Sequence, residues 1–190
     1  MDIRELDRRA LETLDKLVAT VRPADLGRRT PCDGWDLGDL LRHQVSENRG
    51  FGIALREGSA PDWDSGELGD DPYRSYAESV EGVLATFDDD ELLTRPVTVR
   101  EFGTFPGRVA VGMHLVDSVA HGWDIARGLC LPYDPDPEAV RAALDIAERI
   151  PADPEFRRER GSFAPVVELS AAAPELERFL ALLGRSPGWS

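Results

Sequence analysis

The stretch from Gly112 to Leu129 constrains the fold of this chain more than any other. It carries two of the three histidines in the protein, His114 and His121, with Asp117 between them. On an α-helix with 3.6 residues per turn, Asp117 and His121 lie one turn apart on the same face, and His114 falls in the same sector. The stretch therefore predicts a helix that offers several metal-binding side chains from one face.

The third histidine, His43, lies far upstream in another segment with helical periodicity. We expect a helix from about Asp36, whose carboxylate can cap free N–H groups, to about Glu57, before Gly58. His43 projects about 60° from Leu40, at the edge of the apolar stripe of that helix. It is therefore expected to point toward the margin of the protein interior.

Together these residues form a candidate metal site. An Asp-x-x-x-His pair on a helix can reach one ion, because neighbours at i and i+4 lie close together. His43 is the natural third ligand, and three protein ligands would leave open positions for water or substrate, as in catalytic zinc sites. Zinc is favoured, and nickel, iron and manganese stay open.

Two further side chains near the Asp-x-x-x-His pair, His114 and Asp124, could also take part in the candidate metal site. His114, three residues before Asp117, could replace that ligand, add a fourth or bind a ligand through a hydrogen bond. Asp124 could orient a ligand in the same way, but a solvated or helix-C-terminal carboxylate is expected. An interpretation without a metal site also stays open, in which two imidazoles lie on the surface and one histidine lies in the core.

Other polar and aromatic side chains beside the two motifs carry weaker signals. Cys32 precedes a helix whose dipole could lower the pKa of its thiol, although a small buried cysteine is the commoner case. Trp35 and Trp123 are expected in the core or in a pocket wall. Asp33 and Glu47 are expected to be solvated.

The rest of the chain predicts a mainly α protein. Apolar spacing places further helices at residues 2–21, 72–87, 107–127, 137–150 and 174–183, with Gly128 as a C-cap of the helix at 107–127. Residues 92–105 indicate an extended segment or a short β-hairpin, 151–165 an irregular stretch and 166–169 a short strand. Residues 58–71 indicate a polar loop that could be mobile and cover a pocket.

We therefore expect a four-helix bundle in a single domain over residues 1–190. Its core would span about 1–130, and additional helices would form a C-terminal extension over about 131–190. The formal net charge of −14 disfavours nucleic acid and anionic membranes as partners. The charged N-terminus lacks the apolar region of a signal peptide, and two cysteines form no secreted-type framework, so a cytoplasmic protein is expected. A homodimer is left open.

Three motifs carry a resemblance to a known family. Residues 30–43, TPCDGWDLGDLLRH, resemble the opening T-P-C-x-x-W-x-V-x-D-L-x-x-H of actinobacterial metal-binding proteins related to the N-terminal domain of mycothiol-dependent maleylpyruvate isomerase. Residues 117–126, DSVAHGWDIA, are similar to D-x-x-x-H-G-W-D-L-A of that family. Residues 182–189, LLGRSPGW, are similar to its ending L-L-G-R-D-P-x-W.

The resemblance implies a DinB-like four-helix bundle with a divalent metal held by His43, Asp117 and His121. In DinB relatives the first ligand of the pair is usually histidine, and in the isomerase branch it is glutamate. Asp117 has a shorter side chain, which keeps His114 as an additional or alternative ligand.

The family also implies thiol-transfer chemistry with mycothiol, bacillithiol or glutathione. We therefore expect a metal-dependent transferase, in which the metal lowers the pKa of a small-molecule thiol that attacks an electrophile. The alternatives are a metal-dependent hydrolase and a non-catalytic, metal- or ligand-binding stress-response module on the same bundle. The additional C-terminal domain of the isomerase is not recognised in this sequence, so maleylpyruvate is not expected as the substrate.

Overall fold

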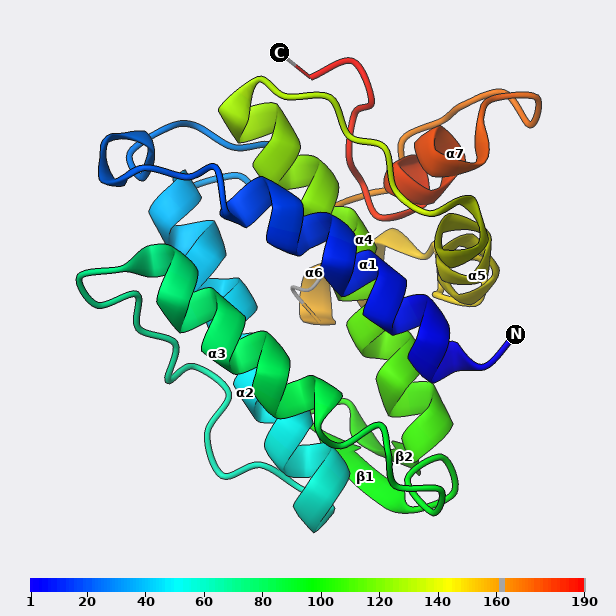
Figure 1. Ribbon diagram of the computed structural model, residues 1–190. Coiled ribbons are helices and arrows are strands. Elements are labelled where there is room, and N and C mark those ends of the chain that lie inside the picture. The colour runs from blue at the N-terminus through cyan, green and yellow to red at the C-terminus, as the bar shows by residue number, and fades with distance from the viewer. Residues whose placement is uncertain (161–162, 190) are drawn as a thin grey trace.

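Four long helices carry the core of the structure, which is a computed structural model that describes residues 1–160 and 163–189. They are α1 (Ile3–Val18), α2 (Leu37–Glu57), α3 (Pro72–Leu84) and α4 (Gly107–Leu129) (Figure 1). The predicted mainly α bundle is confirmed. Among the described residues, none of the helices combines the length and the apolar character that crossing a bilayer requires.

The ends of α2 form as their residues dictate. The Asp36 carboxylate accepts a hydrogen bond from the Asp39 backbone N–H at 2.8 Å, and the Asp39 carboxylate accepts one from the Asp36 N–H at 3.1 Å. This reciprocal pair satisfies N–H groups that the first helical turn leaves free. Gly58 ends the helix in the left-handed region at φ 90°. Both predicted boundaries of α2 are confirmed.

The other helix ends differ from the predictions by a few residues. Both α1 and α3 end three residues earlier than predicted, at Val18 and Leu84. The predicted C-cap of α4 is wrong, because the helix runs through Gly128 and Leu129. Cys130 takes the left-handed cap conformation there, at φ 57°.

The four helices run in two directions. In Figure 1, α1 and α4 run one way, whereas α2 and α3 run the other way. Side-chain contacts agree, since His43 of α2 faces Asp117 of α4, and Asn48, further along α2, faces His114, earlier in α4. Because α2 and α3 run in the same direction, the segment that connects them must run back along the whole length of α2.

Residues 58–71 make this return, and they lie along α2. The Trp63 ring packs edge-on against Phe51 at 5.1 Å and rests on Gly50. The Gly66 N–H donates to Ser46 Oγ at 2.8 Å. Close contacts with the helix therefore hold this loop, and the predicted mobility stays a prediction.

A short antiparallel hairpin connects α3 to α4. It confirms the hairpin, one of the two structures expected for residues 92–105. Its strands are β1 (Pro96–Val99) and β2 (Gly103–Pro106), with Pro96 opposite Pro106. Arg100, just after β1, has φ 43°, in the region that favours glycine. This conformation places its guanidinium against α2, as described below.

The C-terminal part adds α5 (Pro137–Ala147), α6 (Pro154–Arg160) and α7 (Glu175–Leu182). Helix α5 packs beside α1 and α4, and α7 packs against α5 (Figure 1). Side chains of all four helices belong to one apolar cluster. Helix α5 ends three residues before the predicted end. The short 3-10 helix Pro23–Asp25 follows α1.

Two predictions for the C-terminal part are wrong. Residues 154–160 are helical where an irregular stretch was expected, because Asp153 caps the Phe156 N–H at 2.8 Å and Pro154 suits a first helical turn. Residues 161–162 of that stretch lie outside the described residues. Residues 166–169 form no strand; Val167 N–H donates to Ala181 O at 3.0 Å instead of to a neighbouring strand.

The docking of the loop on α2 gives a test with two helical glycines. A Cβ at Gly50 would overlap the Trp63 ring, with Cζ3 at 2.8 Å, whereas a Cβ at Gly82 would meet nothing within 4 Å. Gly50→Ala is expected to reduce the free energy of unfolding by about 1–3 kcal/mol. Gly82→Ala is expected to raise it by about 0.5–1 kcal/mol. Denaturant unfolding measures both, and equal effects of the two changes would contradict the packing described.

Candidate metal centre

Helices α2 and α4 bring together the three residues predicted as ligands. His43, Asp117 and His121 each offer a ligand atom, and these atoms lie within 4.8 Å of one another. Asp117 Oδ1 is 3.3 Å from His43 Nε2 and 3.3 Å from His121 Nε2. The two imidazole rings approach edge to face, with their centroids 4.8 Å apart.

The spacing of these atoms fits a divalent ion. Ligand atoms at 2.0–2.1 Å from a tetrahedral zinc ion lie about 3.3 Å from one another. Charge-assisted hydrogen bonds between nitrogen and a carboxylate are usually shorter, about 2.7–2.9 Å. The two separations of 3.3 Å at Asp117 are therefore closer to the edge of a coordination tetrahedron than to strong hydrogen bonds.

Hydrogen bonds from behind orient two of the three side chains. Gln44 Nε2 donates to Asp117 Oδ2 at 2.6 Å, which leaves Asp117 Oδ1 for the histidines. Asp124 Oδ2 lies 2.9 Å from His121 Nδ1. An Nδ1–H bonded to this carboxylate leaves the lone pair of Nε2 free to bind a metal, a common arrangement at metal sites.

The structure corrects the expectation for Asp124. The side chain is fully buried and not solvated. Arg185 Nε lies 3.0 Å from both of its oxygens, and Arg185 Nη2 lies 2.7 Å from Oδ2. Burial acts to raise the pKa of Asp124, but Arg185 and His121 outweigh it and lower the pKa to about 2. Asp124 is therefore a carboxylate at neutral pH.

The expectation for Glu47 is also wrong. Glu47 is buried beneath the hairpin, where the Arg100 guanidinium donates to Glu47 Oε1 and, at 2.9 Å, to the Trp63 carbonyl. Glu47 Oε1 lies 3.9 Å from His43 Nδ1, beyond hydrogen-bond distance. The periodicity of α2 could not reveal this burial, because the compensating charge comes from a distant hairpin. Asp33 is exposed, as expected.

Cys32 takes part in a second group of three potential ligands, with His121 and Asp124. Its Sγ lies 3.1 Å from Asp124 Oδ2 and 3.8 Å from His121 Nδ1. Arg185 Nη2 already lies 3.9 Å from this sulfur. Since a guanidinium occupies the place of a cation there, this second group fits a metal less well.

His114 is not brought to the candidate centre. It is buried in the core, where Nδ1 lies 2.7 Å from Asp7 Oδ2 and Nε2 lies 2.9 Å from Asn48 Oδ1. Asn48 Nδ2 in turn donates to Ser79 Oγ at 2.9 Å. Both ring nitrogens of His114 are thus occupied by partners from α1 and α2, so the residue links helices within the bundle.

One side of the centre is open to solvent. About a fifth of the His43 and Asp117 side chains is exposed. The indole of Trp35 is 40% exposed, so it does not lie in the core, and its ring lies 5.0 Å from that of His43; its role as a pocket wall stays a prediction. Trp123 is buried in the core. Solvent therefore reaches His43 and Asp117, two of the three candidate ligands.

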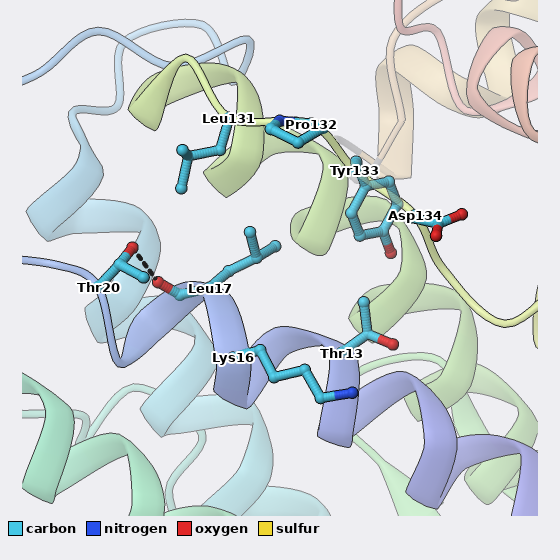
Figure 2. A pocket seen from close by; sticks show the side chains of 8 residues that line it. All are labelled: Thr13, Lys16, Leu17, Thr20, Leu131, Pro132, Tyr133 and Asp134. Atoms are coloured by element: carbon cyan, nitrogen blue, oxygen red, sulfur yellow. Dashed lines mark hydrogen bonds between the residues drawn. The ribbon is translucent and has the colours of Figure 1, made fainter.

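A separate groove of about 220 Å³ lies between α1 and residues 131–134. Figure 2 shows Lys16 and Thr13 on one side of it and Tyr133 and Asp134 on the other. None of the candidate ligands lines this groove, so it is not the mouth of the metal centre.

Opposite charges at the centre shift the pKa values of Asp117 and His121. Burial acts to raise the pKa of Asp117, but His121 and His43 outweigh it and hold the pKa well below its usual range. Burial acts to lower the pKa of His121, but Asp117 and Asp124 raise it well above its usual range. Without a metal, Asp117 is therefore an anion beside a His121 cation at neutral pH.

This pair predicts the pH dependence of the metal-free protein. Because the pKa of His121 is raised on folding, its stabilisation is complete below about pH 6.5 and is lost as pH rises through the folded pKa. Because the pKa of Asp117 is lowered, its stabilisation is complete above about pH 4 and is lost at lower pH. With a chelator present, the melting temperature is expected to fall as pH rises above about 6.5, and less steeply for His121→Gln. Identical slopes for both proteins would contradict the charge assignment.

Comparisons with known proteins agree with the fold. The family model described as the mycothiol maleylpyruvate isomerase N-terminal domain matches residues 8–126. Two uncharacterized Mycobacterium tuberculosis proteins, MT0763 and Rv0738, are each 28% identical over 191 residues, covering 98% of this chain and 99% of their own length.

A solved structure shows the same fold. It is the crystal structure of a histidine-to-alanine mutant of the mycothiol-dependent maleylpyruvate isomerase, similar with a TM-score of 0.61 at 12% identity. The similar region covers 76% of this chain and 66% of the isomerase chain. At this identity the similarity concerns the fold, and the chemistry must be argued from the site.

Proposed function

The chain belongs to the family of mycothiol maleylpyruvate isomerase N-terminal domains, and on this premise we propose that it is a divalent-metal-binding enzyme that transfers a low-molecular-weight thiol. The observation that carries the proposal is the geometry of His43, Asp117 and His121, whose facing atoms are spaced as ligands of one ion. Zinc is the favoured metal, and nickel or another first-row ion is the alternative. Mycothiol is the favoured thiol, because the related isomerase is mycothiol-dependent.

Each part of the centre has a role in this proposal. A bound divalent ion supplies Lewis acidity, which lowers the pKa of a thiol and favours its thiolate. His43, Asp117 and His121 hold the ion, while Gln44 and Asp124 fix the orientation of two of them. The exposed faces of the ligands leave room for the thiol and for an electrophile.

Trp35 limits the direction of approach. Its ring stands beside His43 and, at 6.4 Å, beside His121. It therefore shields the two imidazoles on one side and leaves an apolar surface facing an incoming molecule. The thiol proton would go to solvent at this open side. The thiolate would then form a sulfur–carbon bond at an electrophilic carbon, and the leaving group of that carbon would depart to solvent with the electron pair of the broken bond.

Metal binding gives the first test. Zinc at 100 times its Kd is expected to stabilise the protein by about 2.7 kcal/mol, or roughly 5–11 °C in melting temperature for a chain of this size. His43→Ala and His121→Ala are expected to abolish this shift, whereas His114→Gln, which lies outside the centre, is expected to keep it. The measurement is thermal unfolding with and without zinc, on protein purified without a His-tag.

Elemental analysis of the same preparations is the control. A protein without bound metal and without a zinc shift would overturn the proposal. Loss of the shift in His114→Gln but not in His121→Ala would place the metal elsewhere in the core.

Thiol binding gives the second test. In the cobalt-substituted protein, mycothiol is expected to produce a thiolate-to-cobalt charge-transfer band, because its sulfur would enter an open coordination position. Asp117→Asn is expected to weaken or remove the band along with the metal. If cobalt binds but neither mycothiol, bacillithiol nor glutathione changes the spectrum, the thiol-transfer part of the proposal is wrong.

A further inference from the structure

The C-terminal tail reaches into the candidate metal centre. The chain turns at Gly184, with φ 82°, directly after α7. The Arg185 backbone N–H donates to Leu180 O at 2.9 Å, which anchors the turn to the helix. The side chain of Arg185 then extends to Asp124 on α4. Arg185 lies outside the stretch 8–126 that matches the family model.

The contact between Arg185 and Asp124 fixes the carboxylate in place. Two nitrogens of the guanidinium contact it, with Nε 3.0 Å from both oxygens and Nη2 2.7 Å from Oδ2. The Asp124 side chain is fully buried and that of Arg185 is 15% exposed. A planar guanidinium on a carboxylate restrains rotation as well as distance.

The restrained carboxylate is the one that orients His121. Asp124 Oδ2 both accepts from Arg185 Nη2 and lies 2.9 Å from His121 Nδ1. A rotation of Asp124 would therefore turn the imidazole and move its Nε2 away from Asp117. Without Arg185, the buried Asp124 would also lose the cation that compensates its charge.

Within residues 1–160 and 163–189, no equivalent series of hydrogen bonds leads from an arginine to the ring of His43. Arg100 binds Glu47, but Glu47 Oε1 lies 3.9 Å from His43 Nδ1, so no hydrogen bond passes the restraint on to the ring. Among the arginines in the described part of the chain, Arg185 is thus the one whose contacts lead to a candidate ligand through hydrogen bonds.

We propose that Arg185 is a positioning residue for the metal centre, so that docking of the C-terminal tail and metal binding by His43, Asp117 and His121 are coupled. The inference rests on the proposed metal site. The coupling acts in both directions, because two linked binding equilibria favour each other by the same factor. Bound zinc therefore strengthens docking of the tail, and loss of the tail weakens zinc binding.

The test compares Arg185→Gln with Arg178→Gln in the full chain. Arg178, on α7, makes an exposed ion pair with Glu148 at 2.8 Å and is the matched control. In competition with a chromophoric chelator, Arg185→Gln is expected to bind zinc about 10–100-fold more weakly. Arg178→Gln is expected to bind zinc as the unsubstituted protein does, because exposed ion pairs contribute little.

A second readout separates positioning from a merely structural role. The ligand-field spectrum of the cobalt-substituted protein reports the geometry of the ligands, and Arg185→Gln is expected to change it. Arg185→Lys keeps the charge but loses the planar fork, so an intermediate affinity is expected. If Arg185→Gln does not fold, Arg185→Lys carries the comparison.

The outcomes distinguish this inference from the proposed function. Zinc binding by the unsubstituted protein and Arg178→Gln, with unchanged affinity and spectrum in the Arg185 variants, overturns the coupling alone. No zinc binding by the unsubstituted protein overturns both. In the reverse direction, zinc is expected to slow tryptic release of the C-terminal peptide that begins at Ser186, and an unchanged rate contradicts the coupling.

Discussion

Helix α4 buries ionisable side chains along its length, and the arrangement of the other elements depends on compensating them. Asp117 meets the two histidines and Gln44, Asp124 meets Arg185, and His114 meets Asp7 of α1. A buried charge that loses its partner costs about 3–5 kcal/mol, a large share of the stability of a protein. The helices and the tail are therefore held in register by polar contacts as well as by apolar packing. The same contacts hold the candidate ligand atoms of His43, Asp117 and His121 close together.

Much of the bundle could be predicted from the sequence, because helix formation is governed locally. Asp36 and Gly58 bound α2 as expected, and the three-four spacing of apolar residues found each long helix. The pairing of Asp117 with His121 followed from their spacing on one helix. Their meeting with His43 was an inference across the chain, supported by its position on the edge of an apolar stripe, and the structure brings the three together.

Three of the predictions that failed concern partners distant in sequence. Asp124 and Glu47 were expected in solvent because both are acidic, and nothing near them in the sequence shows that Arg185 and Arg100 arrive from the tail and the hairpin. The short strand at 166–169 failed for a related reason, since β-branched residues favour a strand only where a neighbouring strand is available. Local sequence patterns could not show which distant arginine compensates a buried carboxylate. The arginine within the L-L-G-R motif was nevertheless a signal available in the sequence.

The family gives the fold, and the site gives the chemistry. At 12% identity to the solved isomerase, the backbone is shared but no residue role follows from it. The proposed chemistry instead depends on Asp117, which faces two imidazole nitrogens at equal distances. X-ray absorption by the zinc-loaded protein tests this most directly. We expect a shell of only nitrogen and oxygen at about 2.0–2.1 Å, with scattering from two imidazoles. A sulfur atom at about 2.3 Å in the absence of added thiol would place the metal at Cys32 and contradict it.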